Sequence, residues 1–232
     1  MNEFLVNDET TLASFDEGIE EVKKNIDQDP LKIHIEGLRE SSRAFFLSRL
    51  IQSISKPVVV LTPNQNTGEK LIGDLRYFCK FNRVQKNIRF FPSWEVVPYE
   101  NISPSSEVMG ERLEILQLLQ RNEISLLVVP VDSIMQCVIP RKELSDHTFF
   151  LRVGEILERE FLETCLLDNG FVRLPMVENR GHFSVRGDIV DVYLPAAINP
   201  VRVEFFDNTI ESIREFDITT QVSLKIVEKL KI

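Results

Sequence analysis

Apolar residues over the first part of the chain recur at spacings that alternate between helix and strand. An amphipathic helix is predicted by five apolar residues that repeat every three or four positions: Leu12, Phe15, Ile19, Val22 and Ile26. Residues 31–35 alternate like a strand, residues 43–54 are apolar on one helical side, and residues 57–61 form an apolar run of strand length. Strand, helix and strand at this spacing predict a βαβ unit with a right-handed crossover.

The same alternation continues to about residue 138. We expect four further elements: a helix over 67–79, a strand over 88–91, a helix from Ser105 or Ser106, and a strand over 124–129. Asn66 or Thr67 is the expected cap of the first of these helices. Residues 1–138 therefore predict a parallel sheet flanked by helices, a doubly wound α/β layer.

The pattern changes near Pro140. One helix is predicted over 154–169, and four strands follow Gly170, over 182–185, 189–193, 201–206 and 209–216. Asp207–Asn208 is the expected hairpin turn between the last two strands. The fold class is therefore α/β, a parallel-sheet domain over 1–138 followed by a small antiparallel α+β domain over 139–218. Residues 219–232 are expected to be the truncated start of a following segment, stopping in mid-element with no core partner.

The loop between the first predicted strand and its helix has the position of a phosphate-binding loop but not its residues. The pattern G-x-x-x-x-G-K-[ST] retains only Gly37. Ser42 replaces the second glycine, Arg43 replaces the lysine, and Ala44 replaces the hydroxyl that ligates magnesium. Glu40 adds a negative charge where phosphates would bind. We expect a degenerate nucleotide loop without hydrolysis, and weak nucleotide binding stays an alternative.

Charge and composition limit the other possibilities. The net charge of −9 is spread over both halves of the chain, which argues against non-specific nucleic-acid binding. Five cations nevertheless lie close together: Arg76, Lys80, Arg83, Lys86 and Arg89. A solvated helix face is the favoured interpretation of this cluster, and a DNA-binding track is the alternative.

Metal, cofactor and membrane signals are weak throughout. Cys79, Cys137 and Cys165 are far apart, and no C-x-x-C pair suggests a zinc site or a disulfide, so we expect mostly buried, reduced thiols. Asp132 is a lone acid after the strand that would carry a Walker B pair. The sequence predicts no metal and no cofactor. No signal peptide and no apolar stretch of membrane-spanning length is present, which favours a cytoplasmic protein without membrane contact.

Two segments resemble a known family. The first comprises residues 90–100 (FFPSWEVVPYE), 103–105 (SPS) and 111–113 (ERL), and the second comprises residues 181–193 (GHFSVRGDIVDVY), 200–207 (PVRVEFFD) and 210–214 (IESIR). Both are similar to the N-terminal, UvrB-like region of the bacterial transcription-repair coupling factor (Mfd) family. The second is also shared with the excision-repair helicase UvrB.

The resemblance implies different roles for the two predicted domains. Residues 1–138 would be a degenerate copy of the RecA/UvrB-like ATPase domain, and residues 139–218 would bind the damage-recognition protein UvrA. RNA polymerase and DNA would be contacted only through C-terminal parts absent from this sequence, since the full-length relatives are ATP-dependent DNA translocases. The implied function is a non-catalytic module that recruits UvrA to stalled RNA polymerase. The alternative is a nucleotide-binding or ATP-hydrolysing DNA repair domain.

The resemblance also implies which residues meet UvrA. Arg173 and Arg186 fall on two of the three arginines of the UvrA-facing surface of UvrB, and Ser184 departs from the third. On a strand, Ser184 and Arg186 point one way, while Phe183 and Val185 point the other way. A core-facing Phe183 would leave Arg186 outside, within reach of a partner's carboxylate. From the strand pattern alone, surface ion pairs with Glu178 or Asp188 are the plainer expectation for both arginines.

Overall fold

The computed structural model describes residues 3–4, 12–25, 34–94, 96 and 103–232. It contains two compact units, the first formed by Met1–Ser93 with Leu118–Gln136 and the second by Trp94–Gln117 with Cys137–Ile232. Parts of three sequence predictions lie outside the described residues: Ile26 at the end of the first helix, the start of the strand over 31–35, and residues 95 and 97–100 of the first family-like segment.

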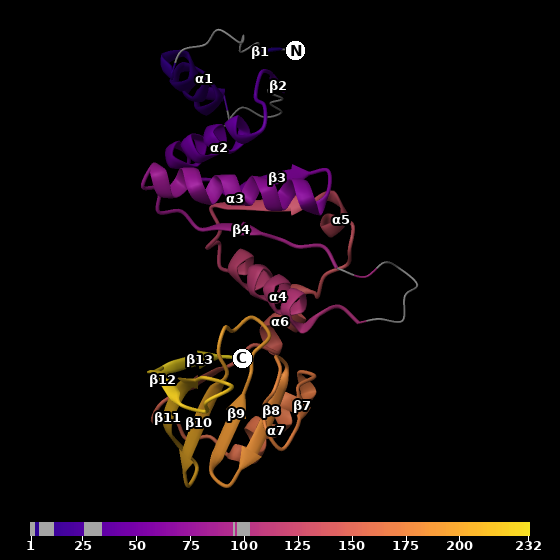
Figure 1. The fold of residues 1–232 in the computed structure, drawn as a ribbon, viewed down its shortest axis with the longest axis vertical. Coiled ribbons are helices and arrows are strands. Elements are labelled where there is room, and N and C mark those ends of the chain that lie inside the picture. The colour runs from indigo at the N-terminus through magenta and orange to yellow at the C-terminus, as the bar shows by residue number, and fades with distance from the viewer. Residues whose placement is uncertain (1–2, 5–11, 26–33, 95, 97–102) are drawn as a thin grey trace. The chain divides into compact units, whose positions relative to one another are not determined.

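Unit 1 is built on a parallel three-stranded sheet, as the apolar runs predict (Figure 1). Its order is β3 (Val58–Thr62), β5 (Leu126–Pro130) and β4 (Ile88–Phe90). Every residue of β5 is buried, because a strand at the centre of a parallel sheet has neighbours on both sides and helices over its face.

Helices α2 (Ser41–Ser53) and α3 (Gln65–Phe81) cover one face of this sheet. Helix α1 (Leu12–Asn25) packs on α2, where Ile19 joins Phe46 and Leu50 in a separate cluster. The core between α2, α3 and the sheet comprises Ala44, Ile51, Ile72, Leu75, Cys79, Leu126 and Val128. Helix α3 begins earlier than predicted, because the side chain of Asn64 accepts a hydrogen bond of 2.9 Å from the backbone N–H of Thr67. Asn64 is therefore the cap, and the predicted caps Asn66 and Thr67 are wrong.

The predicted βαβ unit around α2 does not form as a single sheet. Strand β2 (His34–Ile35) pairs with β1 (Glu3–Phe4) and, in the described part of the chain, not with β3. The alternation of residues identifies a strand but not its partner, since pairing depends on contacts distant in sequence. A short helix, α5 (Val131–Ile134), follows β5 directly.

Unit 2 contains a six-stranded sheet in the order β12-β11-β10-β9-β8-β7. The strands are β7 (Val172–Arg173), β8 (His182–Arg186), β9 (Ile189–Val192), β10 (Val201–Phe206), β11 (Thr209–Phe216) and β12 (Ser223–Ile226). All neighbours are antiparallel except β7 and β8, which are parallel. The predicted turn at Asp207–Asn208 joins β10 to β11, and Asp207 has the positive φ of 55° that such a turn requires.

One face of this sheet is covered by α7 (Arg159–Asp168). Leu162 and Leu166 of the helix are fully buried in a core that also contains Phe183, Val190, Val192, Val203 and Ile213. The predicted helix over 154–169 begins too early. Gly154 has a φ of +83° and Ile156 forms an isolated bridge with Thr209, so the chain before Arg159 is extended rather than helical. Unit 2 also holds α6 (Arg141–Asp146) and most of α4 (Ser106–Gln120).

The last residues of the chain belong to unit 2, contrary to the expectation that they lack a core partner. Strand β12 pairs with β11, and β13 (Lys229–Lys231) pairs with β6 (Phe150–Arg152). Leu230 lies in the core of the unit. The partner of β13 is far earlier in the sequence, so the local pattern gave no sign of it. Among the described residues, no helix is both long enough and apolar enough to cross a membrane.

Candidate protein-docking surface

The two predicted docking arginines lie on neighbouring strands at one edge of the unit 2 sheet. Arg173 ends β7, the edge strand, and Arg186 ends β8. The register sets Arg173 beside Phe183, three residues before Arg186. Both arginines are about half exposed, with 52% and 47% of their side-chain surface accessible.

Alternation along β8 divides its residues between the two faces of the sheet, as predicted. Phe183 is fully buried in the core beneath α7, and Val185 packs against the same core. Ser184 and Arg186 therefore lie on the opposite face. There the register aligns Ser184 with Asp191 on β9 and Asp191 with Arg202 on β10. A polar row thus crosses three adjacent strands.

Asp191 is the centre of this row. It is 2% exposed and accepts hydrogen bonds from two arginines. Arg202 donates from Nε over 2.7 Å and from Nη2 over 2.9 Å to its two oxygens, and Arg186 donates from Nη2 over 2.6 Å. Bidentate arginine–carboxylate pairing is the strong form of this interaction. The buried carboxylate is therefore matched by two cations, one on each neighbouring strand.

Arg202 is held more tightly than Arg186. Its guanidinium lies 4.6 Å from the ring centroid of Phe216, and Nη2 also donates to the side chain of Gln221. The hydrogen bond to Asp191 raises the pKa of Arg202, against the opposing effect of burial. Arg186 makes one hydrogen bond to the same carboxylate, from Nη2, and 47% of its side chain is exposed. Asp191 therefore fixes one end of its guanidinium, which carries five N–H donors, and leaves other donors accessible.

Arg173 makes a different contact. Its Nη1 donates to Oε2 of Glu163 on α7 over 2.8 Å. Oε1 of Glu163 also lies 3.3 Å from Nε of Arg159. Nη1 of Arg159 donates to the carbonyl of Gly187 over 2.5 Å. The ion-pair partners expected from the strand pattern were Glu178 and Asp188, and both are wrong: Asp188 lies beside Arg159 instead.

Arg173 and Arg186 consequently leave the sheet on opposite faces. Arg173 reaches the face that α7 covers, whereas Arg186 reaches the face that carries Asp191. One partner can contact both arginines only by covering the β7 edge of the sheet, between the two faces. The structure thus brings them to the same edge but not into one cluster.

The other two residues of the predicted docking segment, Phe183 and Ser184, are inside the unit. Phe183 has no exposed surface, as its predicted core-facing position requires, and Ser184 is 1% exposed with a hydroxyl that has no hydrogen-bond partner in the described part of the chain. Neither side chain can touch a partner in this conformation, so both can support the docking surface only from within. The physical reason is that both faces of β8 are covered near its middle, a fact that alternation alone does not reveal.

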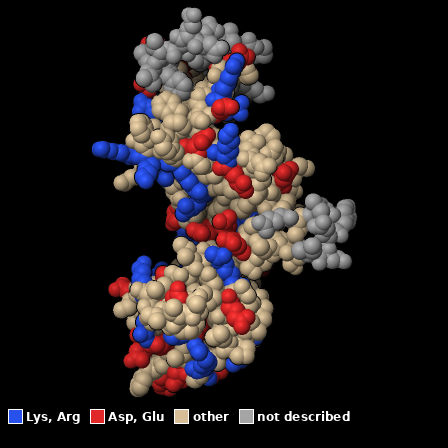
Figure 2. Space-filling view, in the orientation of Figure 1, with Lys and Arg blue, Asp and Glu red and all other residues tan. Residues whose placement is uncertain are grey.

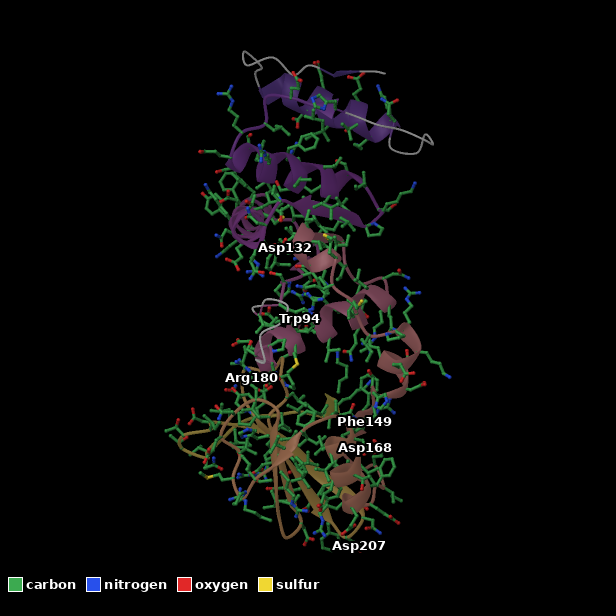
Figure 3. The ribbon with its side chains drawn as sticks, turned by 90° about the vertical axis from the view of Figure 1, so that its right-hand side faces the viewer. Trp94, Asp132, Phe149, Asp168, Arg180 and Asp207 are labelled. Atoms are coloured by element: carbon green, nitrogen blue, oxygen red, sulfur yellow. The ribbon has the colours of Figure 1, made fainter. Side chains whose placement is uncertain are left out.

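Sequence reasoning missed the residues that position the arginines. Asp191 alternates with the core residues Val190 and Val192, and this alternation was the available signal that it shares a face with Ser184 and Arg186. Arg180 was missed as well. It pairs with Glu107 at 3.1 Å, lies 5.6 Å from the ring centroid of Tyr193, and is labelled in Figure 3. No local pattern predicts such contacts between distant segments.

The degenerate nucleotide loop of unit 1 is closed onto itself. Gly37 has a φ of +80°, and Nε of Arg43 donates to the carbonyl of Leu38 over 3.1 Å. The hydroxyl of Ser42 donates to the carbonyl of Arg39 over 2.6 Å. Ala44 is fully buried in the core, where a metal ion could not reach it.

A magnesium site has little support elsewhere in unit 1. Asp132, the lone candidate acid, is exposed on α5 directly after β5 (Figure 3). The described residues contain no group of three metal-ligating side chains.

Of the thiols, Cys79 is buried, which raises its pKa, whereas Cys137 is exposed.

Comparisons with known proteins agree on one family. The UvrB interaction domain model matches residues 149–232. The transcription-repair-coupling factor of Myxococcus xanthus is 33% identical over 203 residues, which cover 86% of this chain and 17% of that protein. The namesakes from Bacillus subtilis and Escherichia coli are 30% and 28% identical and cover 84% and 82% of this chain. The chain spans 16–17% of the length of these relatives. Residues 149–232 therefore form a UvrB interaction domain, and the chain belongs to the family of bacterial transcription-repair-coupling factors.

Proposed function

We propose that this chain is a non-catalytic interaction module of transcription-coupled nucleotide excision repair, and that it recruits UvrA through the β7 edge of its UvrB interaction domain. RNA polymerase contact and DNA translocation would depend on other parts of a full-length protein. The observation that carries the proposal is the half-exposed Arg186, which the buried Asp191 holds at the outer edge of this domain.

The geometry of Arg186 suits recognition of a carboxylate. An arginine that must be ordered on binding loses side-chain entropy, and a contact made beforehand lowers that cost. Asp191 supplies such a contact, while the outward N–H donors remain available for a partner's acidic side chain. Arg173 is held in the same manner by Glu163. Both arginines thus present positive charge at one sheet edge in positions set by the fold.

Catalysis is disfavoured by the closed loop of unit 1. A cavity of about 680 Å³ lies beside it, between α2 and α3, and this cavity supports the alternative of a nucleotide-binding domain. Arg43 and Lys70 line it, but so do the carboxylates of Glu40 and Asp74, which would repel phosphates. We therefore propose that unit 1 is a degenerate, RecA-like ATPase domain and that no nucleotide is hydrolysed in this cavity.

The first prediction concerns ATP hydrolysis. The chain should show no ATPase activity above a mock preparation, because Ala44 offers no magnesium ligand and is buried. The double variant Arg43→Lys, Ala44→Thr should remain inactive, since a lone, exposed Asp132 does not replace a Walker B pair. Release of phosphate is the measurement. Turnover by the double variant, or by the native chain with dependence on Arg43, would contradict the non-catalytic assignment.

The second prediction concerns Asp191. Asp191→Asn leaves two arginines facing a neutral group, and we expect it to lower the free energy of unfolding by about 2–4 kcal/mol. This is below the value for a fully buried pair because Arg186 is half exposed. Urea unfolding is the measurement. Asp188→Asn is the matched control, since Asp188 is exposed and should change stability by no more than about 0.5 kcal/mol. Equal effects of the two changes would show that the Asp191 network contributes little.

The third prediction concerns UvrA binding itself. Removing one partner of a desolvated interfacial charge pair costs about 2–5 kcal/mol, and each tenfold in affinity is about 1.4 kcal/mol. Arg186→Ala and Arg173→Ala should each weaken binding of purified UvrA at least tenfold. Arg152→Ala, which removes an exposed arginine from β6 of the same unit, should not. Titration calorimetry and thermal melts of each variant are the measurements.

The melts separate two explanations for a loss of affinity. Lost binding with an unchanged melting temperature supports a docking role for the arginines. Lost binding with a collapsed melt would mean that they are structural. Unchanged affinity in the double variant Arg173→Ala, Arg186→Ala would remove this edge of the sheet from the docking site.

A further inference from the structure

Helix α3 exposes two aromatic rings near its C-terminal end. Tyr77 and Phe81, one helical turn apart, are 66% and 71% exposed. Their ring planes are within 14° of each other and their centroids are 6.4 Å apart. The opposite side of the helix supplies the core through Leu75 and Cys79. These rings are therefore not part of the core of unit 1, although large apolar side chains are normally placed there.

The pair is held in place from beneath. Phe78 is partly buried and meets the ring of Tyr77 edge-on at 5.4 Å. Phe78 also meets Phe45 of α2 edge-on at 5.4 Å. Aromatic contacts of this geometry fix ring orientation as well as adding stability. Tyr77 and Phe81 thus present nearly parallel faces on a rigid helix, and little order has to be created when a ligand stacks on them.

Cations surround the rings. Figure 2 shows lysine and arginine side chains gathered over the C-terminal end of α3 and the turn that follows. Arg76, Lys80 and Arg83 are exposed there, and Lys86 is partly exposed. Within the part of the chain that the structure describes, none of these four forms an ion pair. By contrast, Arg159, Arg173, Arg186, Arg202 and Arg214 of unit 2 all have carboxylate partners.

We propose that this patch, defined as Arg76, Tyr77, Lys80, Phe81 and Arg83, is a binding site for single-stranded nucleic acid. Unpaired cations match backbone phosphates, and exposed aromatic faces stack with bases. A duplex would satisfy the cations only, because its bases are stacked on each other. An acidic peptide would likewise leave the two rings without a matching group. Among these ligands, only an unstacked strand uses both features.

The inference goes beyond the proposed function, which concerns unit 2 and a protein partner. It also revises the interpretation of the basic cluster as a solvated helix face. Because each phosphate contact releases counterions, binding by the patch should be strongest at low ionic strength and should weaken steeply as salt is added. The net charge of −9 opposes this binding and limits its affinity.

The test measures binding of the whole chain to fluorescently labelled 12-mers of dT and rU, with a 12-base-pair duplex for comparison. Fluorescence anisotropy reports the affinity over a series of salt concentrations. We expect both single strands to bind, and the duplex to bind at least tenfold more weakly. The ratio of the dT and rU affinities then identifies which nucleic acid is preferred. Tyr77→Ala with Phe81→Ala should weaken single-strand binding at least tenfold, about 1.4 kcal/mol. Phe206→Ala is the matched control, since Phe206 is 74% exposed on β10.

A second pair of variants separates charge from stacking. Arg76→Gln with Lys80→Gln should lower the slope of log affinity against log salt by about 1.4, because each phosphate contact of a single strand contributes about 0.7. Lys142→Gln with Lys225→Gln removes the same charge from unit 2 and should leave the slope unchanged. Tyr77→Trp, which keeps a ring face, should retain binding and thereby controls for folding of the alanine variants.

Three results would overturn the proposal. The first is absence of single-strand binding at low salt. The second is binding that does not depend on Tyr77 and Phe81. The third is equal affinity for the duplex or for a poly-glutamate peptide, which would reduce the patch to a non-specific cationic surface.

Discussion

The polar face of unit 2 depends on one buried carboxylate. Asp191 is buried on one face of the unit 2 sheet, and the apolar core of the unit lies on the opposite face. An ionised group that is buried in this way is costly unless it is paired and hydrogen-bonded. Arg202 supplies most of the compensation through two hydrogen bonds and is itself fixed against Phe216. Arg186 completes the set from the exposed side. The ion pair that offsets the cost of burying the Asp191 carboxylate therefore also places a cation, Arg186, at the surface.

This arrangement links stability to recognition. If Arg186 were positioned only by solvent-exposed contacts, its side chain would sample many rotamers before binding. Because Asp191 is buried and is shared between β8, β9 and β10, the guanidinium is attached to the interior of the sheet rather than to a surface side chain. Arg173 is attached to α7 through Glu163, so two different elements fix the two arginines at one edge. Among the described residues of unit 1 there is no comparable network, and the exposed cations near Lys80 lack carboxylate partners there.

Local pattern predicted much of the fold because many elements here are set by neighbouring residues. The apolar run of β5 and the turn at Asp207–Asn208 are examples, as is the alternation that separates Phe183 from Arg186. Features that depend on distant segments were not predictable. The pairing of β13 with β6 joins the end of the chain to a strand that precedes the whole six-stranded sheet, and the extended chain at Ile156 is fixed by Thr209.

The candidate site shows the same division. Strand parity placed Arg186 outside, but it could not show that Ser184 is covered or that Asp191 is the partner of Arg186. Likewise, the basic residues of α3 were visible in the sequence, whereas the stacking of Tyr77 on Phe81 required the structure. Charge alone favoured a solvated face, and only the exposed rings point to a ligand with π-faces. The residue types predicted which chemical groups a ligand could meet, and packing determined which of those groups are exposed to bind it.

The most direct test of the central claim is hydrogen exchange of this chain with and without purified UvrA. A partner that covers the β7 edge should slow exchange at the backbone amides of Val172–Arg173 and of the turn between β8 and β9. Residues 223–226 of β12, at the other edge of the same sheet, should exchange at an unchanged rate. Protection confined to β12, or to unit 1, would contradict the account and place the UvrA contact elsewhere.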